Sequence, residues 1–423
     1  MTTWTRRDAL KILGAATLSS LAGTSHAAFD PLKTGGKRIV VLGGGFGGTI
    51  AAKTLRIADP SLEVVLIDRA TRHTMCPGSN LVIGGSRTIE QNSFGYEQLV
   101  KNYGIHFVQD EITAIDGARK LLVGKAGNLA YDRLIVSPGI DFRFDEIAGY
   151  DPASTPQLMP HAWIAGEQTM LLRRQIEAMP DGGSVIVSIP LAPFRCPPGP
   201  YERISQMAWY FKQAKPKSKI IVLDANPDIA SKAGLFRKGW EKNYQGLIDY
   251  RASNQVVKVS PQTMTVHTDV EDLRADVINL IPPQKAGRIA ELAGLLGDDK
   301  RWCPVDAITF ESTKVPGIHV IGDSCVAGAM PKSGFSANSQ AKICALNLVA
   351  TLNDKKPVNP SAANICYSFI TEREAVSVAA VYRVSDGAYA AVAGAGGLSP
   401  DASELEGRYA RAWLENIRAE MSS

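Results

Sequence analysis

Apolar runs of strand length alternate with helical patterns along most of the chain. The runs are rich in β-branched residues and lie at 37–42, 63–68, 131–137, 182–190, 218–224 and 317–321. Helical patterns separate them, for example at 49–57 and 201–214. Buried parallel strands form such continuous runs, and helices connect them. The pattern therefore predicts an α/β fold with two Rossmann-like, doubly wound domains of the dinucleotide-binding type.

From about residue 356 onward the chain follows another pattern. Apolar residues alternate in the segment AVSVAAVYR at 375–383. In a final helical pattern, one stripe of large apolar residues is spaced four apart, at Leu405, Tyr409, Trp413 and Ile417. This stripe predicts a helix that docks on the rest of the protein. We expect a smaller α+β domain here.

The first strand runs directly into the glycine pattern Gly43-x-Gly45-x-x-Gly48, and a predicted helix follows it. In this context the glycines allow a tight turn, close approach of the backbone to a diphosphate, and close packing of helix on strand. Twenty residues later, the second strand ends in Asp68, which can accept hydrogen bonds from ribose hydroxyls. These features together predict a dinucleotide cofactor.

A second glycine fingerprint is missing after the strand at 182–190. The sequence there reads FRCPPGPYE, with Cys196 and several prolines, and only Gly199 remains. Proline lacks the N–H donor that a diphosphate needs, and side chains block its approach. We therefore expect no nicotinamide cofactor in the second domain, and the cysteine indicates a different source of electrons.

The N-terminus has the pattern of an export signal. Arg6 and Arg7 precede the weakly apolar stretch ILGAATLSSLAG, and Ser25-His26-Ala27 resembles a cleavage site. This favours a twin-arginine signal peptide at 1–27 and a periplasmic protein, with an ordinary secretory signal as the alternative. After residue 27 no stretch is long and apolar enough to cross a membrane. A net charge of +4 gives no basis for nucleic-acid binding.

Several motifs make the whole mature chain resemble the flavoprotein subunit of flavocytochrome c sulfide dehydrogenase, in the pyridine nucleotide-disulfide oxidoreductase superfamily. They are MCPGSN around Cys76, PHAWIAGEQT at 160–169, FRCPPGPYER around Cys196, NLIPPQKAG at 279–287, WCPVD at 302–306, GDSCVAGAMPKSGFSANSQAK at 322–342, and NICYS around Cys366. The resemblance implies FAD as the cofactor. It also implies an FAD-binding domain at 28–158 that continues at 286–355, a second Rossmann-like domain without a nicotinamide site at 159–285, and a C-terminal interface domain at 356–423.

Roles for individual residues follow from the same resemblance. Cys76 would form a thioether to the flavin, and Cys196 and Cys366 would form a redox disulfide. Glu202, six residues after Cys196 at the start of a predicted helix, is the acid-base candidate by its position, with a carboxylate that only complements the helix dipole as the alternative. No metal is expected. The other cofactor-binding residues would be Gly43, Gly45, Gly48, Asp68, Arg69, Asn80, Ser137, Pro138, Gly139, Gly322, Asp323, Met330 and Lys332. Without the resemblance, six cysteines allow many pairings, and a plain stabilising bridge stays open. Cys303, Cys325 and Cys344 fit buried small hydrophobes.

The activity that this resemblance implies is the oxidation of hydrogen sulfide to elemental sulfur or polysulfide. The chain has no Cys-x-x-Cys-His motif, so haem would lie on a separate c-type cytochrome subunit that accepts the electrons. One alternative is a sulfide:quinone oxidoreductase, which the Arg- and Glu-rich final helix disfavours. Another is an exported flavoprotein electron carrier without turnover, which would not need the two cysteines.

Overall fold

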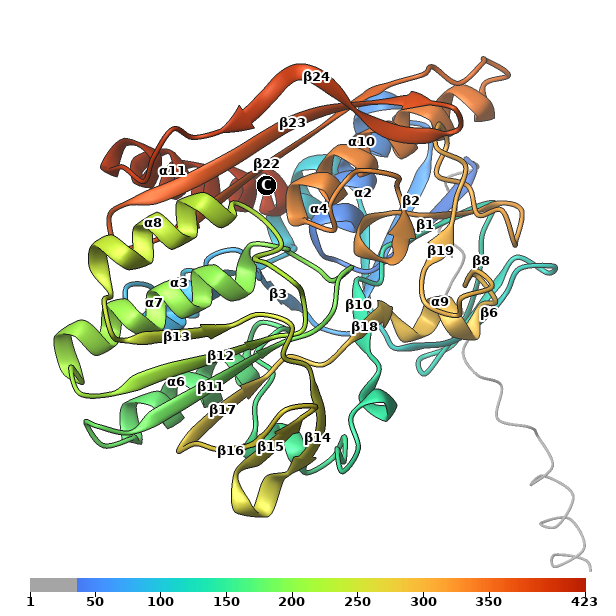
Figure 1. Ribbon diagram of the computed structural model, residues 1–423. Helices are drawn as coiled ribbons and strands as arrows, with labels where there is room; N and C mark the ends of the chain where they lie inside the picture. The colour runs from blue at the N-terminus through green and yellow to red at the C-terminus, as the bar shows by residue number, and fades with distance from the viewer. Residues whose placement is uncertain (1–35) are drawn as a thin grey trace, which may run out of the picture.

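The computed structural model describes residues 36–423, and the expected signal peptide at 1–27 lies outside the described residues. Two parallel sheets with helices around them make up most of the fold, and a long antiparallel sheet crosses over both (Figure 1). The α/β class predicted from the sequence is confirmed. The residue boundaries that the sequence analysis gave for each domain stay a prediction.

The first parallel sheet has the strand order β20-β9-β1-β2-β5. Its strands are β1 (Arg38–Leu42), β2 (Glu63–Asp68), β5 (His106–Gln109), β9 (Arg133–Val136) and β20 (Ile318–Val320). Helix α2 (Phe46–Ala58) packs against β1 and β2, and α10 (Gly334–Leu352) packs against α2. The chain leaves this sheet after β9 and rejoins it at β20, so the segment after 286 completes the sheet that the N-terminal segment began.

The second parallel sheet has the order β13-β12-β11-β17. It consists of β11 (Ser184–Ile189), β12 (Lys219–Asp224), β13 (Ile248–Arg251) and β17 (Val277–Leu280), with helices α6 (Glu167–Ala178), α7 (Gly199–Ala214) and α8 (Ala233–Asn243). Helix α7 begins two residues before the predicted start, because Pro200 fits the first turn of a helix. Helix α2 likewise begins at Phe46 rather than Thr49.

Short elements connect and extend the two sheets. Strands β10 (Ile140–Phe142) and β18 (Gln284–Ala286) form an antiparallel pair where the chain passes from one parallel sheet to the other. The remaining short elements are β3 (Arg72–Thr74), α3 (Ser79–Gly84), β4 (Ser93–Gly95), α4 (Glu97–Tyr103), β6 (Ile112–Asp116), β7 (Leu121–Gly124), β8 (Asn128–Ala130), α5 (Thr155–Leu158), β14 (Val256–Ser260), β15 (Thr265–Thr268), β16 (Asp272–Arg274), α9 (Arg288–Leu292), β19 (Cys303–Pro304) and β21 (Cys325–Val326).

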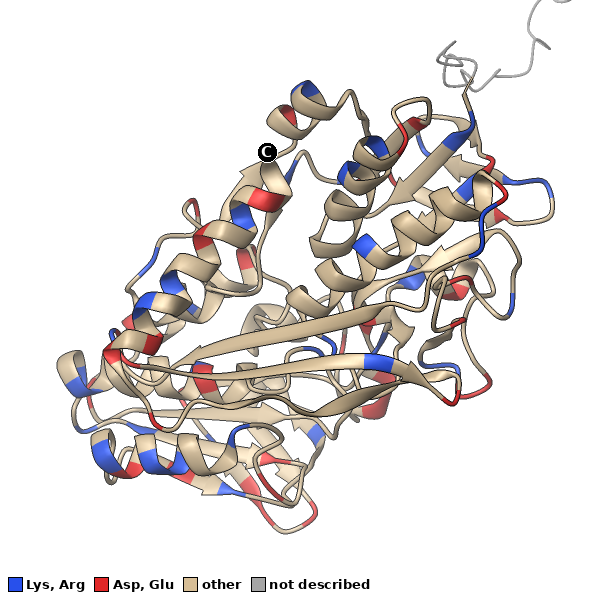
Figure 2. Ribbon diagram, turned by 90° about the horizontal axis from the view of Figure 1, so that it is seen from above, with Lys and Arg blue, Asp and Glu red and all other residues tan. Residues whose placement is uncertain are grey.

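The C-terminal segment forms an antiparallel sheet of β22 (Ser361–Phe369), β23 (Ala375–Ser385) and β24 (Ala388–Leu398), followed by helix α11 (Glu404–Ser422). Figure 2 shows that the long strands carry few charged residues, whereas α11 carries residues of both signs. Strand β22 packs against α10 of the first unit and α7 of the second. The C-terminal sheet therefore brings side chains of β22 to the junction of the two parallel-sheet units.

Helix α11 docks through a different face from the one predicted. Its buried residues are Gly407, Ala410, Leu414, Ile417 and Met421, whereas Leu405 is 47% exposed and Tyr409 51% exposed. The predicted stripe is therefore wrong at its first two positions. Gly407 explains the difference, because a Cβ there would lie 1.7 Å from the carbonyl oxygen of Arg373. The first part of the helix therefore makes its closest approach through the small residues Gly407 and Ala410, and the later part docks through larger residues that include Ile417.

Candidate active site

The turn between β1 and α2 has no room for side chains at two of its glycines. Gly43 has a φ of 105°, and a Cβ there would lie 2.3 Å from the Ser137 carbonyl oxygen. A Cβ on Gly48 would lie 1.7 Å from the Gly43 carbonyl oxygen. Gly45 caps α2 without a side chain, and the first turn of α2 has no acidic residue. The turn therefore offers bare backbone and a helix N-terminus, which suits a diphosphate.

Asp68 stands at the end of β2 beside this turn. Its Oδ2 accepts a hydrogen bond from the amide of Gly44 at 2.6 Å, and its Oδ1 accepts one from Ala70 at 2.8 Å. These two bonds fix the carboxylate at the place where a ribose would meet it. Arg69, which the sequence suggested as a neighbour in cofactor binding, is exposed and does not line the cavity.

Asp323 contributes a buried oxygen that is free to bind a ligand. It lies in the turn Gly322–Ser324 and lines the cavity. Its Oδ1 has no hydrogen-bond partner among residues 36–423, and burial raises the pKa of the carboxyl. An unpaired buried oxygen is costly unless a ligand satisfies it. A backbone turn for a diphosphate, an acid for ribose hydroxyls and an unpaired carboxyl for a further hydroxyl together fit FAD.

One cavity connects the nucleotide turn with the C-terminal sheet. Of the sequence-predicted site residues, its lining contains Gly45, Cys76, Asn80, Ser137, Gly139, Cys196, Glu202, Gly322, Asp323 and Cys366. Three others belong to the turn behind this lining, namely Gly43, Gly48 and Asp68. The structure does not bring Arg69, Pro138, Met330 or Lys332 to the cavity wall.

Lys332 lies behind the cavity wall and is not one of the residues that line it. Its Nζ donates to the carbonyl oxygens of Asp323 at 2.8 Å and Cys325 at 2.9 Å, and it lies 3.8 Å from the centroid of the Trp302 ring. The next residues, Ser333 and Gly334, do line the cavity at the start of α10. The N-terminus of α10 therefore adds positive potential at the wall, and the charge of Lys332 acts from behind it by opposing the rise that burial causes in the pKa of the Asp323 carboxyl. The role of Lys332 in cofactor binding stays a prediction.

Cys196 and Cys366 meet in this cavity although they come from distant parts of the chain. Cys196 lies in the loop before α7 with a φ of 55°, and its amide donates to the Lys332 carbonyl oxygen at 2.7 Å. Cys366 lies on β22, and its thiol is close enough to that of Cys196 for the two groups to affect each other's ionisation. Both are free thiols in this structure. The neighbouring Cys196 thiol, together with the charge of Lys232, lowers the pKa of Cys366 to about 7 against the opposing effect of burial.

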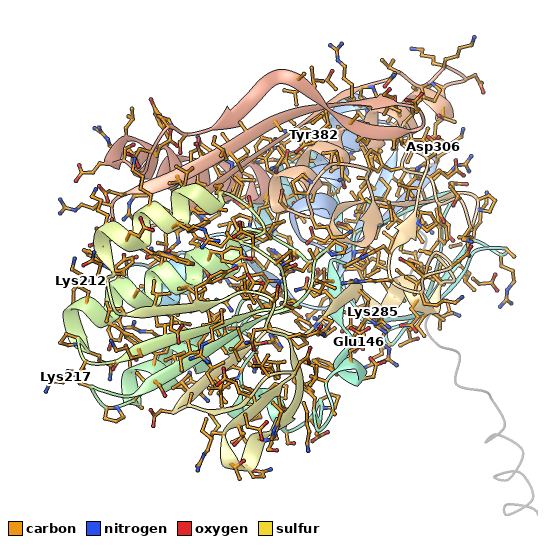
Figure 3. The ribbon with its side chains drawn as sticks, viewed as in Figure 1. Glu146, Lys212, Lys217, Lys285, Asp306 and Tyr382 are labelled. Atoms are coloured by element: carbon orange, nitrogen blue, oxygen red, sulfur yellow. The ribbon has the colours of Figure 1, made fainter. Side chains whose placement is uncertain are left out.

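Glu202 lies one turn into α7 beside the two thiols. Its Oε1 accepts from the Phe369 amide at 2.9 Å, and its Oε2 accepts from the Asn80 side chain at 2.7 Å. Burial nevertheless raises the pKa of this carboxyl. Figure 3 labels Lys212, near the other end of α7, and Lys217, just beyond that end, at the edge of the molecule in this view. The start of α7, by contrast, lines the cavity with Gly199, Glu202 and Arg203.

Arg203 is a residue of the site that the sequence reasoning missed. Its side chain is 1% exposed, and its guanidinium donates to Asn80, Asn279 and the carbonyl oxygens of His161 and Ala162. Burial lowers its pKa to about 9. The residue stands in the motif FRCPPGPYER, directly after the acid-base candidate, and that position was the available signal.

Lys232 is a second residue that the sequence did not reveal. It is 5% exposed, and its Nζ donates to the carbonyl oxygen of Cys366 at 3.0 Å and to Ser368 Oγ at 2.9 Å. Its local sequence, IASKAGLF, contains no motif that would have singled it out. Only its two hydrogen bonds to β22, from the start of α8, bring it to the cysteines.

Cys76 lies between β3 and α3 in the cavity wall. Its Sγ lies 3.7 Å from the carbonyl oxygen of Trp163, which is itself a lining residue. Asn80, one turn later, donates to the carbonyl oxygen of Gly199 at 3.1 Å. These contacts hold the Cys76 segment against the start of α7, so that its thiol faces the same cavity as Cys196.

The other three cysteines are buried away from the cavity. Cys303, Cys325 and Cys344 are each at most 2% exposed, and none of them lines the cavity. Burial raises the pKa of Cys303 and of Cys325 to about 12. High thiol pKa values make these groups poor nucleophiles.

At the carboxyl end of the second parallel sheet, the acidic residue is bound by protein groups. Asp224 ends β12, the position equivalent to Asp68, and it is completely buried. Its Oδ2 accepts hydrogen bonds from the hydroxyls of Tyr201 and Tyr250, both at 2.8 Å, and its Oδ1 binds Asn226. The acid that would hold a ribose is thus already used by protein groups, and Phe194, 2% exposed, fills part of the loop before α7.

Three successive segments of the chain match families of flavoproteins and disulfide oxidoreductases. Residues 37–158 match the pyridine nucleotide-disulphide oxidoreductase family, 169–282 the central part of the sulfide dehydrogenase [flavocytochrome c] flavoprotein chain, and 358–421 its flavin-binding part. The sulfide dehydrogenase [flavocytochrome c] flavoprotein chain of Chlorobaculum thiosulfatiphilum is 54% identical over 48 residues, which is all of that sequence and 11% of this chain. The chain belongs to this flavoprotein family. It is therefore a flavin-binding oxidoreductase chain of the flavocytochrome c type, as the sequence predicted.

Solved structures with little sequence identity share the fold. The sulfide:quinone oxidoreductase of Aquifex aeolicus is 17% identical with a TM-score of 0.73, and the match covers 91% of both chains. The NAD-dependent persulfide reductase of A. fulgidus is 16% identical with a TM-score of 0.60, over 91% of this chain and 77% of that one. At this level of identity, the likeness establishes the architecture and says nothing about substrates.

The described residues contain neither a helix suited to cross a membrane nor a group of side chains suited to hold a metal ion. Within residues 36–423, no helix is long and apolar enough to cross a membrane. The same part of the chain contains no cluster of three or more His, Cys, Asp or Glu residues that could hold a metal ion. The expectation that the site needs no metal stays a prediction.

Proposed function

We propose that this flavoprotein oxidises sulfide to elemental sulfur or polysulfide, with Cys196 and Cys366 as a redox disulfide and FAD as the cofactor. The observation that supports this most strongly is the contact between these two thiols in the cavity that also contains the nucleotide turn. A flavin carrier without turnover would not need a pair of thiols there. A bridge that only stabilises the fold would not need to line the cofactor cavity, as both cysteines do.

The first chemical step is thiol–disulfide exchange. Hydrosulfide attacks one sulfur of the Cys196–Cys366 bridge, and a new S–S bond forms between the substrate and that cysteine. The bond between the two cysteines breaks, and its electron pair leaves on the other sulfur as a thiolate. FAD, when bound, supplies the two-electron acceptor of the overall reaction. The sulfane sulfur then leaves as elemental sulfur or is transferred to a second hydrosulfide as polysulfide, and its bond to the cysteine breaks with the electron pair left on that cysteine. The two thiolates re-form the bridge when two electrons pass from them to the acceptor.

Glu202 is the base that we propose for the proton of hydrogen sulfide. Its raised pKa follows from burial, and a base is effective when its pKa approaches the working pH. The group accepts a proton only as carboxylate, so the rate falls as the pH falls through the raised pKa. We expect Glu202→Gln to lower the rate of flavin reduction by sulfide about 10²-fold near neutral pH.

The measurement for Glu202 is stopped-flow bleaching of the flavin between pH 5 and 9. The ionisation of hydrogen sulfide affects both proteins alike, so the ratio of the two rates isolates the carboxyl. Glu167→Gln, at the start of α6 and outside the cavity lining, is the matched control. A ratio that does not vary with pH would show that Glu202 is not the base.

Cys76 is the residue that we propose to bind the flavin covalently. Its thiol faces the cavity, and a covalent bond would keep a cofactor that cannot be replaced outside the cytoplasm. We expect acid precipitation to leave the yellow colour in the protein pellet, and Cys76→Ala to release all of it into the supernatant. Colour in the supernatant of the parent protein would rule out the bond.

We infer further that electrons pass to a c-type cytochrome subunit and that the complex works in the periplasm. The sequence supports a separate haem carrier, because it has no Cys-x-x-Cys-His motif. The pair Arg6-Arg7, followed by a weakly apolar stretch, supports export by the twin-arginine route. Fractionation of cells that produce the full chain tests the location, and co-purification of a haem protein tests the partner.

An anaerobic titration tests the proposed function as a whole. The purified protein is mixed with sulfide and, separately, with NADH, and the flavin band near 450 nm is followed. We expect bleaching with sulfide and none with NADH, because Asp224 is occupied by Tyr201 and Tyr250. Bleaching by NADH alone would refute the proposal.

A further inference from the structure

A buried lysine lies against the two redox cysteines without a carboxylate partner. Lys232 caps the start of α8 and is 5% exposed. Its Nζ donates to two neutral acceptors on β22, the Cys366 carbonyl oxygen at 3.0 Å and Ser368 Oγ at 2.9 Å. Within residues 36–423, no carboxylate oxygen lies within 4.0 Å of this amine. The cation is therefore anchored but not neutralised by an ion pair.

An uncompensated buried charge is expensive, and proteins keep one where an anion forms during function. The groups that can carry negative charge nearby are the thiols of Cys196 and Cys366 and the carboxyl of Glu202. Interaction with the Cys366 thiol raises the pKa of Cys196, and burial raises the pKa of Glu202, but the charge of Lys232 opposes the increase at both groups. At Cys366 the same charge contributes to a lowered pKa. The lysine thus lies where negative charge appears when the disulfide opens.

We propose that Lys232 is a positioning residue whose ammonium stabilises the thiolate released when the bridge between Cys196 and Cys366 opens. For its role in turnover, this inference rests on the proposed function. Its effect on the thiols, however, can be measured without sulfide, so the two ideas can fail separately. The alternative is that Lys232 only ties α8 to β22 through its two hydrogen bonds.

The other charged groups around the thiols do not replace this lysine. Glu202, on α7, acts in the opposite direction, because its carboxylate raises the pKa of both thiols. Arg203, on the same helix, uses its guanidinium on four oxygens of neighbouring groups and lies over the Trp163 ring at 4.8 Å. Arg195 turns toward the Trp163 carbonyl oxygen. Lys232 is thus the cation that is anchored directly to the strand of Cys366.

The test is the pH dependence of thiol alkylation. The full-length flavoprotein is reduced with a phosphine, desalted without oxygen and treated with iodoacetamide between pH 5 and 10. Peptide mass spectrometry then counts the modification at Cys196 and Cys366 separately from the buried cysteines. We expect the first apparent pKa of the pair to lie near 7 in the parent protein, as for Cys366 in the structure.

Three substitutions at one position separate charge from structure. Lys232→Gln keeps a donor for the two acceptors but removes the charge, and we expect the apparent pKa to rise by about one to two pH units. Alkylation at pH 7 then slows by about 5- to 50-fold. Lys232→Met should behave likewise, whereas Lys232→Arg should keep the low value. Lys238→Met, an exposed lysine on the same helix paired with Asp401, is the matched control and should titrate like the parent.

Folding is checked by far-UV circular dichroism and by the flavin spectrum. A Gln variant that titrates like the parent protein would overturn the inference and leave the structural role. If neither neutral variant folds, the parent protein still decides, because a first apparent pKa above about 8.5, that of an ordinary thiol, would also overturn it. A failure of sulfide to bleach the flavin would refute the proposed function and would leave the alkylation result unaffected.

Discussion

Replacing Cys196 with serine is expected to abolish reduction of the bound flavin by sulfide while FAD stays in place. Serine cannot form a disulfide, so hydrosulfide has no bridge to open and Cys366 has no partner sulfur. We expect the rate of bleaching to fall by about three orders of magnitude or more, as when an essential nucleophile is removed. Stopped-flow absorbance under anaerobic conditions measures this directly.

The loop should survive this substitution. Its backbone is held by the Cys196 amide, which donates to Lys332, and by the Gly199 amide, which donates to Cys196 at 2.8 Å. Neither bond uses the sulfur. The matched control is Cys344→Ala, which removes a buried thiol outside the cavity and should keep the parent rate. Parent-like bleaching in the serine variant would disprove the disulfide mechanism.

The second large effect concerns stability. Replacing Arg203 with methionine is expected to lower the free energy of unfolding by about 3–5 kcal/mol. Methionine has a similar length but no donors, so the oxygens of Asn80, Asn279 and Ala162 lose their partner inside the protein. Buried acceptors without a partner cost about 1–3 kcal/mol each. Urea unfolding followed by circular dichroism gives the difference.

An exposed arginine serves as the matched control, because it tests whether the loss of stability comes from the buried position of Arg203 or from replacing any arginine with methionine. Arg174 lies on α6, is exposed, and its replacement by methionine should change the free energy of unfolding by no more than about 0.5 kcal/mol. Equal losses in both variants would mean that the buried network around Arg203 contributes little. The network joins the Cys76 segment to α7, so its loss should also loosen the cavity wall and raise the rate of FAD release.

Local patterns predicted the nucleotide turn well, because all of its parts lie close together in the sequence. Gly43, Gly48 and Asp68 belong to one strand–helix–strand unit, and the structure confirms that this unit forms. The helix boundaries were off by two or three residues, at Phe46 and Gly199. In both cases, glycine or proline proved compatible with the first turn of a helix, which composition alone does not decide.

Long-range packing decided what the local patterns left open. The stripe on α11 was misplaced because a helix with two possible faces docks with the one that fits its neighbours, here through Gly407 and Ala410. Lys232 and Arg203 entered the site for the same reason. A buried lysine has the same local sequence as an exposed one, and only contacts from β22 distinguish the two.

The sequence by itself determined that one dinucleotide turn is present and a second is absent, because glycines and prolines constrain the backbone within a few residues of themselves. It did not determine which cysteines meet. That depended on β22 crossing the junction of the two sheets, beside the loop that carries Cys196 and the helix that carries Glu202. Contacts between segments so far apart in the chain depend on how whole layers pack, and only the tertiary structure contains that information.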